Sequence, residues 1–236
     1  MTVSVEHPQL PLGLALRDSA RFEGYFAGDN GEAVAALCAA ADGSGESLVY
    51  LAGQQGLGKT HLLQAACHNA GQCGLGATYL PLRELITLSP EALDGLEQMA
   101  VVCLDDIEAI AGQTKWEAAV FNLFNRVRAA GNVMLVAGID MPARCGLELP
   151  DLVSRLGWGL TYTLKPLGEA QVQAALICRA QGRGLELPEE TAQFLLKRIP
   201  RDLPSVFNLL DRLDEASMIE QRRLTIPFVK TMLEIS

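Results

Sequence analysis

The segment from Gly53 to Thr60 limits the possible folds of this chain more than any other feature. It reads G-Q-Q-G-L-G-K-T and matches the phosphate-loop pattern G-x-x-x-x-G-K-[ST] at every fixed position. An apolar run precedes the segment and a helical pattern follows it. Phosphate binding needs that setting, because the loop amides and the N-terminus of the next helix act together. The segment therefore predicts a nucleotide site; the alternative is a glycine-rich turn without a ligand.

The expected roles within this loop follow from the chemistry of its residues. The Lys59 ammonium can reach the β- and γ-phosphates, and the Thr60 hydroxyl can hold Mg²⁺. The predicted nucleotide-binding set is the whole loop and the residue after it: Gly53, Gln54, Gln55, Gly56, Leu57, Gly58, Lys59, Thr60 and His61.

Carboxylates follow two other apolar runs. Residues 101–106 read V-V-C-L-D-D, an apolar strand pattern that ends in Asp105 and Asp106. We expect Asp105 to hold the Mg²⁺ shell and Asp106 to orient a water; the alternative is a strand followed by a polar turn. The run V-M-L-V-A-G-I-D ends at Asp140, which is the candidate for a polar group beside the γ-phosphate. Since turns favour Asp in any case, an ordinary turn residue is the alternative.

The order of apolar and helical patterns indicates the fold class. Apolar strands without polar alternation, separated by helices, indicate a parallel sheet covered on both faces. The predicted strands are Ser47–Ala52, Ala77–Leu82, Ala100–Leu104 and Val133–Ala137, and the helices among them are 32–41, 59–71, 91–98 and 116–128. Asp29 or Asn30 is expected to cap the first of these helices. After Leu167 the patterns are helical only, over 169–181, 189–198, 204–221 and 226–234. We therefore expect a tail over residues 1–20, an α/β domain over 21–167 and an all-α domain over 168–236.

Composition excludes several classes of protein. The formal net charge is −9, whereas a protein that grips duplex DNA usually has a basic surface. The six cysteines form no C-x-x-C pair, so we expect reduced thiols in a cytoplasmic protein rather than a zinc site or a disulfide framework. No apolar run reaches the length of about 18 residues that a membrane span needs, and the N-terminus is not typical of a signal peptide.

Several strings together resemble one family. The run S-R-L-G-W-G at 154–159 is similar to the arginine-finger box of DnaA, and L-D-D-I at 104–107 and F-N-L-F-N-R at 121–126 fit the same domain. The chain resembles the Hda branch of the DnaA/Hda family of AAA+ ATPases most in R-F-E-G-Y-F-A-G-D-N, L-P-D-L-V-S-R-L-G-W-G, F-L-L-K-R and L-T-I-P-F-V-K. The resemblance extends from about Gln9 onward. It implies an AAA+ P-loop fold with a parallel five-stranded sheet and a small C-terminal all-α lid domain.

The resemblance also implies roles for individual residues. Arg155 would be an arginine finger that acts in trans on nucleotide held by a neighbouring protein; the alternatives are a solvated charge or a pair with Asp151 on its own helix. Arg201 would be the sensor-2 arginine, although Arg198 is close to it in sequence. The side chains beside the adenine would be Phe22, Tyr25 and Phe26; ordinary core is the alternative for Phe22. The ligand would be ADP or ATP with Mg²⁺, and the resemblance favours ADP, although the intact loop and carboxylates permit ATP hydrolysis by this chain.

The tail suggests a second partner. Q-L-P-L-G-L resembles the short peptides that bind the DNA polymerase sliding clamp (its β subunit), with the expected contacts at Gln9, Leu10, Leu12 and Leu14; a plain linker is the alternative. The resemblance implies a regulator that docks on the DNA-loaded clamp and promotes hydrolysis of DnaA-bound ATP, which prevents re-initiation of replication. A helicase-loader ATPase would need a further N-terminal domain, and a DnaA-like DNA-binding factor would need a basic domain after Ser236. No specific DNA contact and no membrane contact are expected, and a homo-oligomer is left open.

Overall fold

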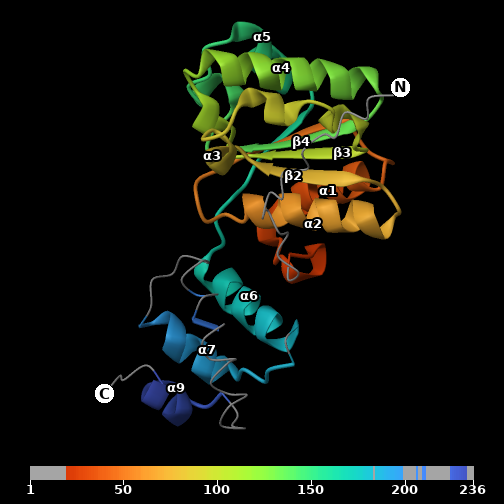
Figure 1. Ribbon diagram of the computed structural model, residues 1–236. Coiled ribbons are helices and arrows are strands. Elements are labelled where there is room, and N and C mark those ends of the chain that lie inside the picture. The colour runs from red at the N-terminus through yellow and green to blue at the C-terminus, as the bar shows by residue number, and fades with distance from the viewer. Residues whose placement is uncertain (1–19, 183, 199–205, 207–208, 211–223, 233–236) are drawn as a thin grey trace, which may run out of the picture.

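The computed structural model describes residues 20–182, 184–198, 206, 209–210 and 224–232. Its centre is a five-stranded parallel sheet in the order β2-β3-β4-β1-β5 (Figure 1). The strands are β1 Leu48–Ala52, β2 Ala77–Pro81, β3 Val101–Asp105, β4 Val133–Gly138 and β5 Leu160–Thr163. The predicted fold class is confirmed. β5 was not located from the sequence, because L-T-Y-T at the edge of the sheet is half-exposed rather than a buried apolar run.

Helices cover both faces of the sheet. In Figure 1, α1 (Gly31–Ala41) and α2 (Lys59–Gln72) lie on one face, and α4 (Thr114–Ala129) and α5 (Pro150–Leu156) lie on the other. Leu48 and Tyr50 of β1 belong to the core on the α4 side, whereas Val49 and Leu51 belong to the core on the α1 and α2 side. Because both alternating sets of side chains are buried, the strands show apolar runs without polar alternation.

Short helical turns make the remaining connections of the α/β part. They are η1 Phe22–Gly24, η2 Gly28–Asn30, α3 Leu82–Leu85, η3 Pro90–Leu93, η4 Leu96–Gln98, η5 Ile107–Ile110 and η6 Pro142–Arg144. The helix predicted over 91–98 is wrong, since η3 and η4 replace it. Gly95 between the two turns has φ 81°, a left-handed conformation that interrupts a helix and that glycine adopts without steric cost.

The C-terminal helices have a core of their own. They are α6 Glu169–Gly182, α7 Glu189–Leu196 and α9 Ile226–Met232, and in Figure 1 they lie below the sheet-containing part. Val172 and Leu176 of α6 pack with Leu195 of α7 and Phe228 of α9. Most of the helix predicted over 204–221 lies outside the described residues. Among those that are described, no helix is long and apolar enough to cross a membrane.

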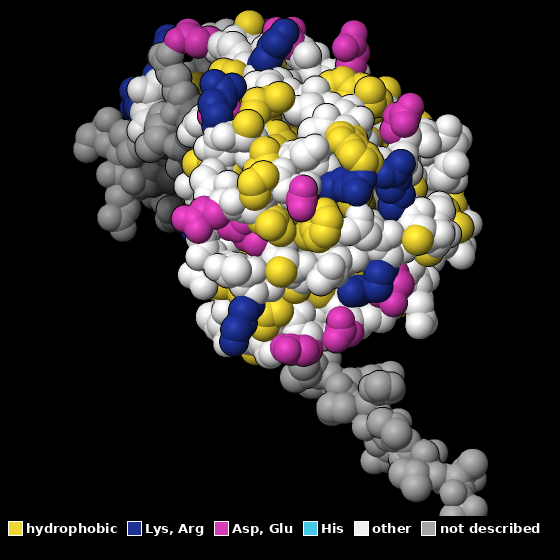
Figure 2. Space-filling model, turned by 90° about the horizontal axis from the view of Figure 1, so that it is seen from above, with side chains coloured by type: hydrophobic (Ala, Val, Ile, Leu, Met, Phe, Trp, Pro, Cys, Tyr) yellow, Lys and Arg dark blue, Asp and Glu magenta, His cyan; other side chains and the backbone are white. Residues whose placement is uncertain are grey.

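The surface on the α4 and α5 side carries mixed side chains. Figure 2 looks onto this side and shows Lys and Arg side chains interspersed with Asp, Glu and hydrophobic side chains. The described side chains on this face therefore form no continuous basic stripe of the kind that follows a nucleic-acid backbone.

Candidate functional site

The loop from Gly53 to Thr60 lies at the carboxyl end of β1 and leads directly into α2. Gly56 and Gly58 have φ values of 86° and 87°, which glycine adopts and other residues resist. A Cβ on Gly58 would lie 2.6 Å from the Tyr25 ring, so glycine is also required there for space. The connection that leaves β1 runs toward the β2 edge of the sheet, whereas the connection that leaves the neighbouring β4 runs the opposite way, to β5. Ligands of open α/β sheets bind at such a point.

The Lys59 side chain lies inside the loop. It is 8% exposed, and its ammonium donates to the carbonyl oxygens of Gly53 and, at 3.1 Å, of Gln54. A buried ammonium in a loop with inward-turning glycines fits the phosphates of a nucleotide. The predicted role of Lys59 stays a prediction, and its position is compatible with that role.

Asp105 ends β3 and meets the start of α2. The Thr60 hydroxyl donates to Asp105 Oδ2 at 2.6 Å, and the Tyr79 hydroxyl donates to the same oxygen at 2.8 Å. Burial raises the pKa of Asp105 above its ordinary value, and the two hydroxyl donors partly offset this rise. Mg²⁺ prefers oxygen donors and usually takes only one or two from protein side chains, so Thr60 and Asp105 fit the predicted metal. Tyr79 was not predicted, because a tyrosine in an apolar strand is typical of ordinary core.

Asp106 is held by an arginine from another element. Its backbone has φ 55° and ψ 53°, left-handed values that are uncommon outside glycine. Arg83 of α3 donates to Asp106 Oδ2 at 3.1 Å and lies 3.7 Å from Glu108 Oε1. This ion pair directs the carboxylate of Asp106 toward α3. Arg83 was not predicted, since nothing in the sequence indicates a pairing across 23 residues.

Asp140 lies in the turn after β4, next to the loop. The Gly53 amide donates to the Gly138 carbonyl at 3.1 Å, which joins the ends of β1 and β4. The Asp140 carboxylate accepts from the Met141 amide at 2.7 Å and from Arg144 at 3.2 Å. The predicted residue therefore lies at the correct end of the sheet, where it also serves its own turn.

The N-terminal arm reaches the loop from outside the sheet. The Tyr25 hydroxyl donates to the Leu57 carbonyl at 3.1 Å, and the Tyr25 and His61 rings lie 5.9 Å apart. Phe22 and Tyr25 pack against the core on the α2 side, and Phe26 is half-buried. Tyr25 and His61 thus border the loop, and Phe22 packs against the core. The contacts of Phe22, Tyr25 and Phe26 with an adenine stay predictions.

Asn30 joins this arm to the start of the C-terminal helices. Its side-chain amide donates to the Lys165 carbonyl at 3.0 Å and accepts from the Lys165 amide at 2.7 Å. Its side chain does not cap α1, although Asn30 occupies the N-cap position. The capping role expected for Asn30 is therefore wrong, because the side chain instead satisfies both backbone groups of a residue far along the chain.

Several predicted residues lie outside the described part of the chain. They are Gln9, Leu10, Leu12, Leu14 and Arg201. Arg198, the neighbour of Arg201 in sequence, is described: its guanidinium lies 3.7 Å from the centroid of the Phe194 ring.

Arg155 lies at the opposite end of the sheet from the loop. It sits in the last turn of α5, shortly before β5, and β5 runs parallel to β1. Its guanidinium lies 3.9 Å from the centroid of the Trp158 ring, and that of Arg128 lies 4.7 Å from it. Within the described residues no ion pair joins Arg155 to Asp151, so that alternative is not supported. A five-residue strand is about 16 Å long, which separates Arg155 from the loop of its own chain.

Glu117 fixes the start of the helix that carries Arg155. Glu117 of α4 is 1% exposed, and its carboxylate accepts from the amides of Gly112, Glu148 and Leu149 at 2.6–3.1 Å. Leu149 is the N-cap residue of α5. This role of Glu117 was not predicted, because a single glutamate on a helix is typical of a solvated face.

Comparisons with known proteins agree with this fold. Residues 169–233 match the family model described as the lid domain of Hda. Domain III of the replication initiation protein DnaA from Thermotoga maritima has 22% sequence identity and a TM-score of 0.79, over 93% of this chain and 98% of that one. AMPPCP-bound DnaA from Aquifex aeolicus has 20% identity and a TM-score of 0.70, over 87% and 68%.

A further match is the Holliday junction branch migration motor RuvB from Thermotoga maritima. It has 19% identity and a TM-score of 0.62, over 91% of this chain and 73% of that one. The fold is the AAA+ fold that these proteins share, as the sequence resemblance implied.

Proposed function

We propose that this chain is a regulatory AAA+ protein that promotes hydrolysis of ATP bound to DnaA. The premise of the proposal is that the chain is an Hda/DnaA-family protein. The lid match and the DnaA-like fold support the premise. The position of Arg155 carries the proposal, because an arginine at the far end of the sheet from its own loop is available to a nucleotide on another molecule.

The chain's own loop would bind an adenine nucleotide. DnaA from Aquifex aeolicus holds AMPPCP on the same fold. Lys59 and the loop amides would bind the phosphates, and Thr60 and Asp105 would hold Mg²⁺, which neutralises phosphate charge when it is bound. Tyr25 would border the base and, with Asn30, would connect the occupied loop to the start of the lid. ADP is the proposed working ligand.

Arg155 would act on the partner's nucleotide. Negative charge spreads over the transferring phosphoryl oxygens in the transition state, and a guanidinium is complementary to that charge. Because the interaction strengthens only as this charge develops, its loss lowers the rate more than the affinity. Asp106 and Asp140 would serve the chain's own nucleotide, at the other end of the sheet.

Arg155→Ala tests the trans mechanism. In an assay with clamp-loaded DNA and ATP-bound DnaA, the variant should keep its own ADP and its clamp contact but lose stimulation of hydrolysis, by a factor of about 10³–10⁵. Arg155→Lys should restore little, because an ammonium lacks the planar fork. Wild-type stimulation by Arg155→Ala would disprove the assignment of Arg155.

The clamp contact is proposed for the tail, residues 9–14. Changing Gln9, Leu10 and Leu12 together to Ala should abolish co-elution with the sliding clamp and leave the melting temperature unchanged, because the tail is expected to lie outside the core. Co-elution of the triple variant with the clamp would show that the tail is a linker.

A further inference from the structure

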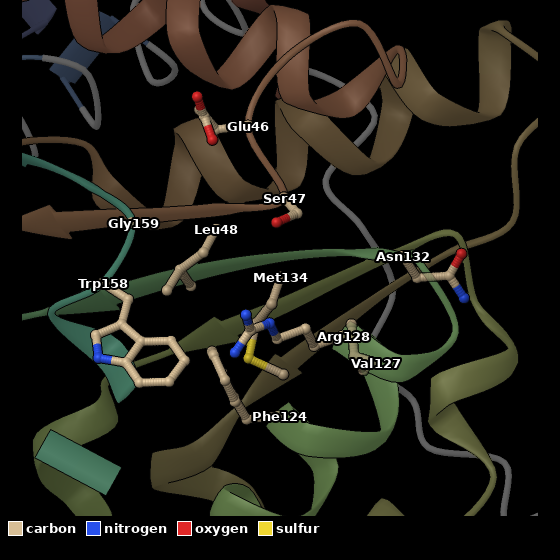
Figure 3. Close-up of a pocket in the computed structure, with 10 residues that line it drawn as sticks. All are labelled: Glu46, Ser47, Leu48, Phe124, Val127, Arg128, Asn132, Met134, Trp158 and Gly159. Atoms are coloured by element: carbon tan, nitrogen blue, oxygen red, sulfur yellow. The ribbon is translucent and has the colours of Figure 1, made fainter. Parts of the chain in front are cut away.

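An exposed tryptophan lies between two arginines at the amino end of the sheet. Trp158 is 53% exposed, although large aromatic side chains are usually highly buried. Arg155 and Arg128 both stack on its ring, at 3.9 and 4.7 Å from the centroid. Figure 3 shows the Arg128 side chain extending toward the Trp158 ring. We call this group the Trp158 stack.

A pocket opens beside the Trp158 stack. Its volume is about 190 Å³, and its lining includes the apolar side chains of Leu48, Phe124, Val127 and Met134 (Figure 3). Small-molecule sites usually have volumes of about 300–1,000 Å³, so this pocket is too small for a nucleotide or cofactor. It is of a size to accept a side chain from another protein.

We propose that the Trp158 stack is the anchor of the interface through which Arg155 reaches a partner's nucleotide. The occupant is the nucleotide-bearing face of a second P-loop ATPase domain, which under the proposed function is that of DnaA. The inference rests on that proposed function. An apolar side chain of the partner would enter the pocket, and an adjacent acidic side chain would pair with Arg128.

Continuity of the surface supports this occupant. The Arg155 guanidinium lies against the Trp158 ring, so a partner that closes over Arg155 also covers Trp158. Tryptophan and arginine beside a desolvated pocket are the residues that most often dominate binding energy. Arg155 would then stabilise the transition state, and Trp158 would contribute to the affinity for the partner.

Charge complementarity supports the acidic side chain that we propose on the partner. The two guanidiniums of the stack are cationic in a chain whose formal net charge is −9. Glu46, also at the pocket, is drawn on the other side of β1 from Arg128 and Trp158 in Figure 3. A carboxylate on the partner would therefore meet a local positive charge. Single-stranded nucleic acid can also stack on tryptophan, but the acidic chain disfavours it.

The test measures stimulated hydrolysis while the variant protein is titrated against a fixed amount of ATP-bound DnaA on clamp-loaded DNA. Trp158→Ala should raise the half-saturating concentration about 30-fold or more, the effect of a binding hot spot, and should leave the plateau rate near wild type. Trp158→Phe should recover most of the affinity. Arg155→Ala should do the reverse. It should lose the plateau rate, whereas its half-saturating concentration, measured by direct binding to DnaA, should change little.

Controls separate folding from binding. Leu88→Ala removes another exposed hydrophobic side chain, 41% exposed, near α3 at the other end of the sheet, and should behave as wild type. ADP affinity and melting temperature should be unchanged in Trp158→Ala, because the side chain is exposed. If Leu88→Ala weakened the complex equally, the effect would not be specific to the stack and the proposal would fail.

Other outcomes overturn the proposal in distinguishable ways. A lower plateau at unchanged affinity would mean that Trp158 only orients Arg155. If Trp158→Ala changed neither the half-saturating concentration nor the plateau rate, the pocket would lie outside the interface. Oligonucleotide binding that Trp158→Ala abolishes, with stimulation intact, would assign the stack to nucleic acid. If Arg155→Ala stimulates normally, the proposed function fails, and direct binding of the Trp158 variants to DnaA still decides whether the stack is an interface.

Discussion

The two ends of the parallel sheet are built differently. At the carboxyl end, polar groups bind one another: Lys59 donates to its own loop, and Thr60 and Tyr79 donate to Asp105. At the amino end, Arg155 stacks on a half-exposed tryptophan. The first arrangement suits a ligand that is enclosed by this chain, whereas the second suits a group that must be presented to another molecule. The difference suggests that binding and stimulation can be separated by mutation.

The largest effect expected from a change at the carboxyl end is on nucleotide affinity. Lys59→Met keeps the length of the buried stem but removes the ammonium, and should weaken ADP and ATP binding by about a hundredfold. A hydrogen bond to a charged group contributes up to about 3 kcal/mol, and about 1.4 kcal/mol corresponds to a tenfold change in affinity. Calorimetry measures the affinity. Affinity equal to that of wild type would remove Lys59 from the site.

The same variant tests whether the two ends are independent. Lys59→Met should leave the iodide quenching of Trp158 fluorescence unchanged, since the stack lies at the far end of the sheet. Iodide reads Trp158, which is 53% exposed, because the other tryptophan, Trp116, is only 4% exposed. A changed tryptophan signal would show that the ends are coupled and would contradict the comparison.

The second expected effect is a loss of stability at Glu117, which holds the start of α5, the helix that carries Arg155. Glu117→Gln should lower the free energy of unfolding by about 1–3 kcal/mol, because the new NH₂ group faces backbone amides that then lack an acceptor. Urea denaturation measures the loss. Glu32→Gln, at an exposed glutamate of α1, is the control and should stay within about 0.5 kcal/mol of wild type.

The Glu117→Gln variant also tests whether the amino and carboxyl ends of the sheet have separate roles. Because the Glu117 carboxylate holds the N-cap of α5, the variant should impair the proposed stimulation of DnaA more than the proposed binding of ADP. Equal losses in both measurements would indicate general destabilisation rather than displacement of α5.

The sequence predicted local features well and long-range pairings poorly. The loop, four strands and most helices follow from motifs and periodicity within short windows. β5 was not located, because an edge strand is buried on fewer sides and lacks the apolar run. Tyr79, Arg83 and Glu117 were missed for another reason: each acts on a group 23 or more residues away, and a single polar residue in a sequence does not identify its partner. The expected cap at Asn30 failed because Lys165 competes for the same side chain.

The smallest expected effect is a gain in stability when Asp105, at the carboxyl end, is changed to Asn. Burial raises the pKa of Asp105 above its ordinary value of 3.8. The folded protein therefore holds this proton at pH values where the unfolded chain has released it, and ionisation costs stability. The contribution of Asp105 is fully present below pH 3.8 and is lost as the pH rises through the raised value. Wild type should thus be less stable at neutral pH than a protein with an uncharged side chain at this position.

Asp105→Asn removes that cost. Its NH₂ group can donate to the Thr60 and Tyr79 hydroxyls after they rotate, and its carbonyl oxygen can still accept from the Asp106 amide, which now binds Asp105 Oδ1 at 3.0 Å. Without nucleotide, the variant should melt a few degrees above wild type at pH 7, and the gap should close toward pH 3.8. Tyr79→Phe should act oppositely, because it removes a donor that lowers the pKa of Asp105. A lower melting temperature for Asp105→Asn at pH 7 would mean that the carboxylate stabilises the fold, and the carboxyl end would then be a structural cluster as much as a ligand site.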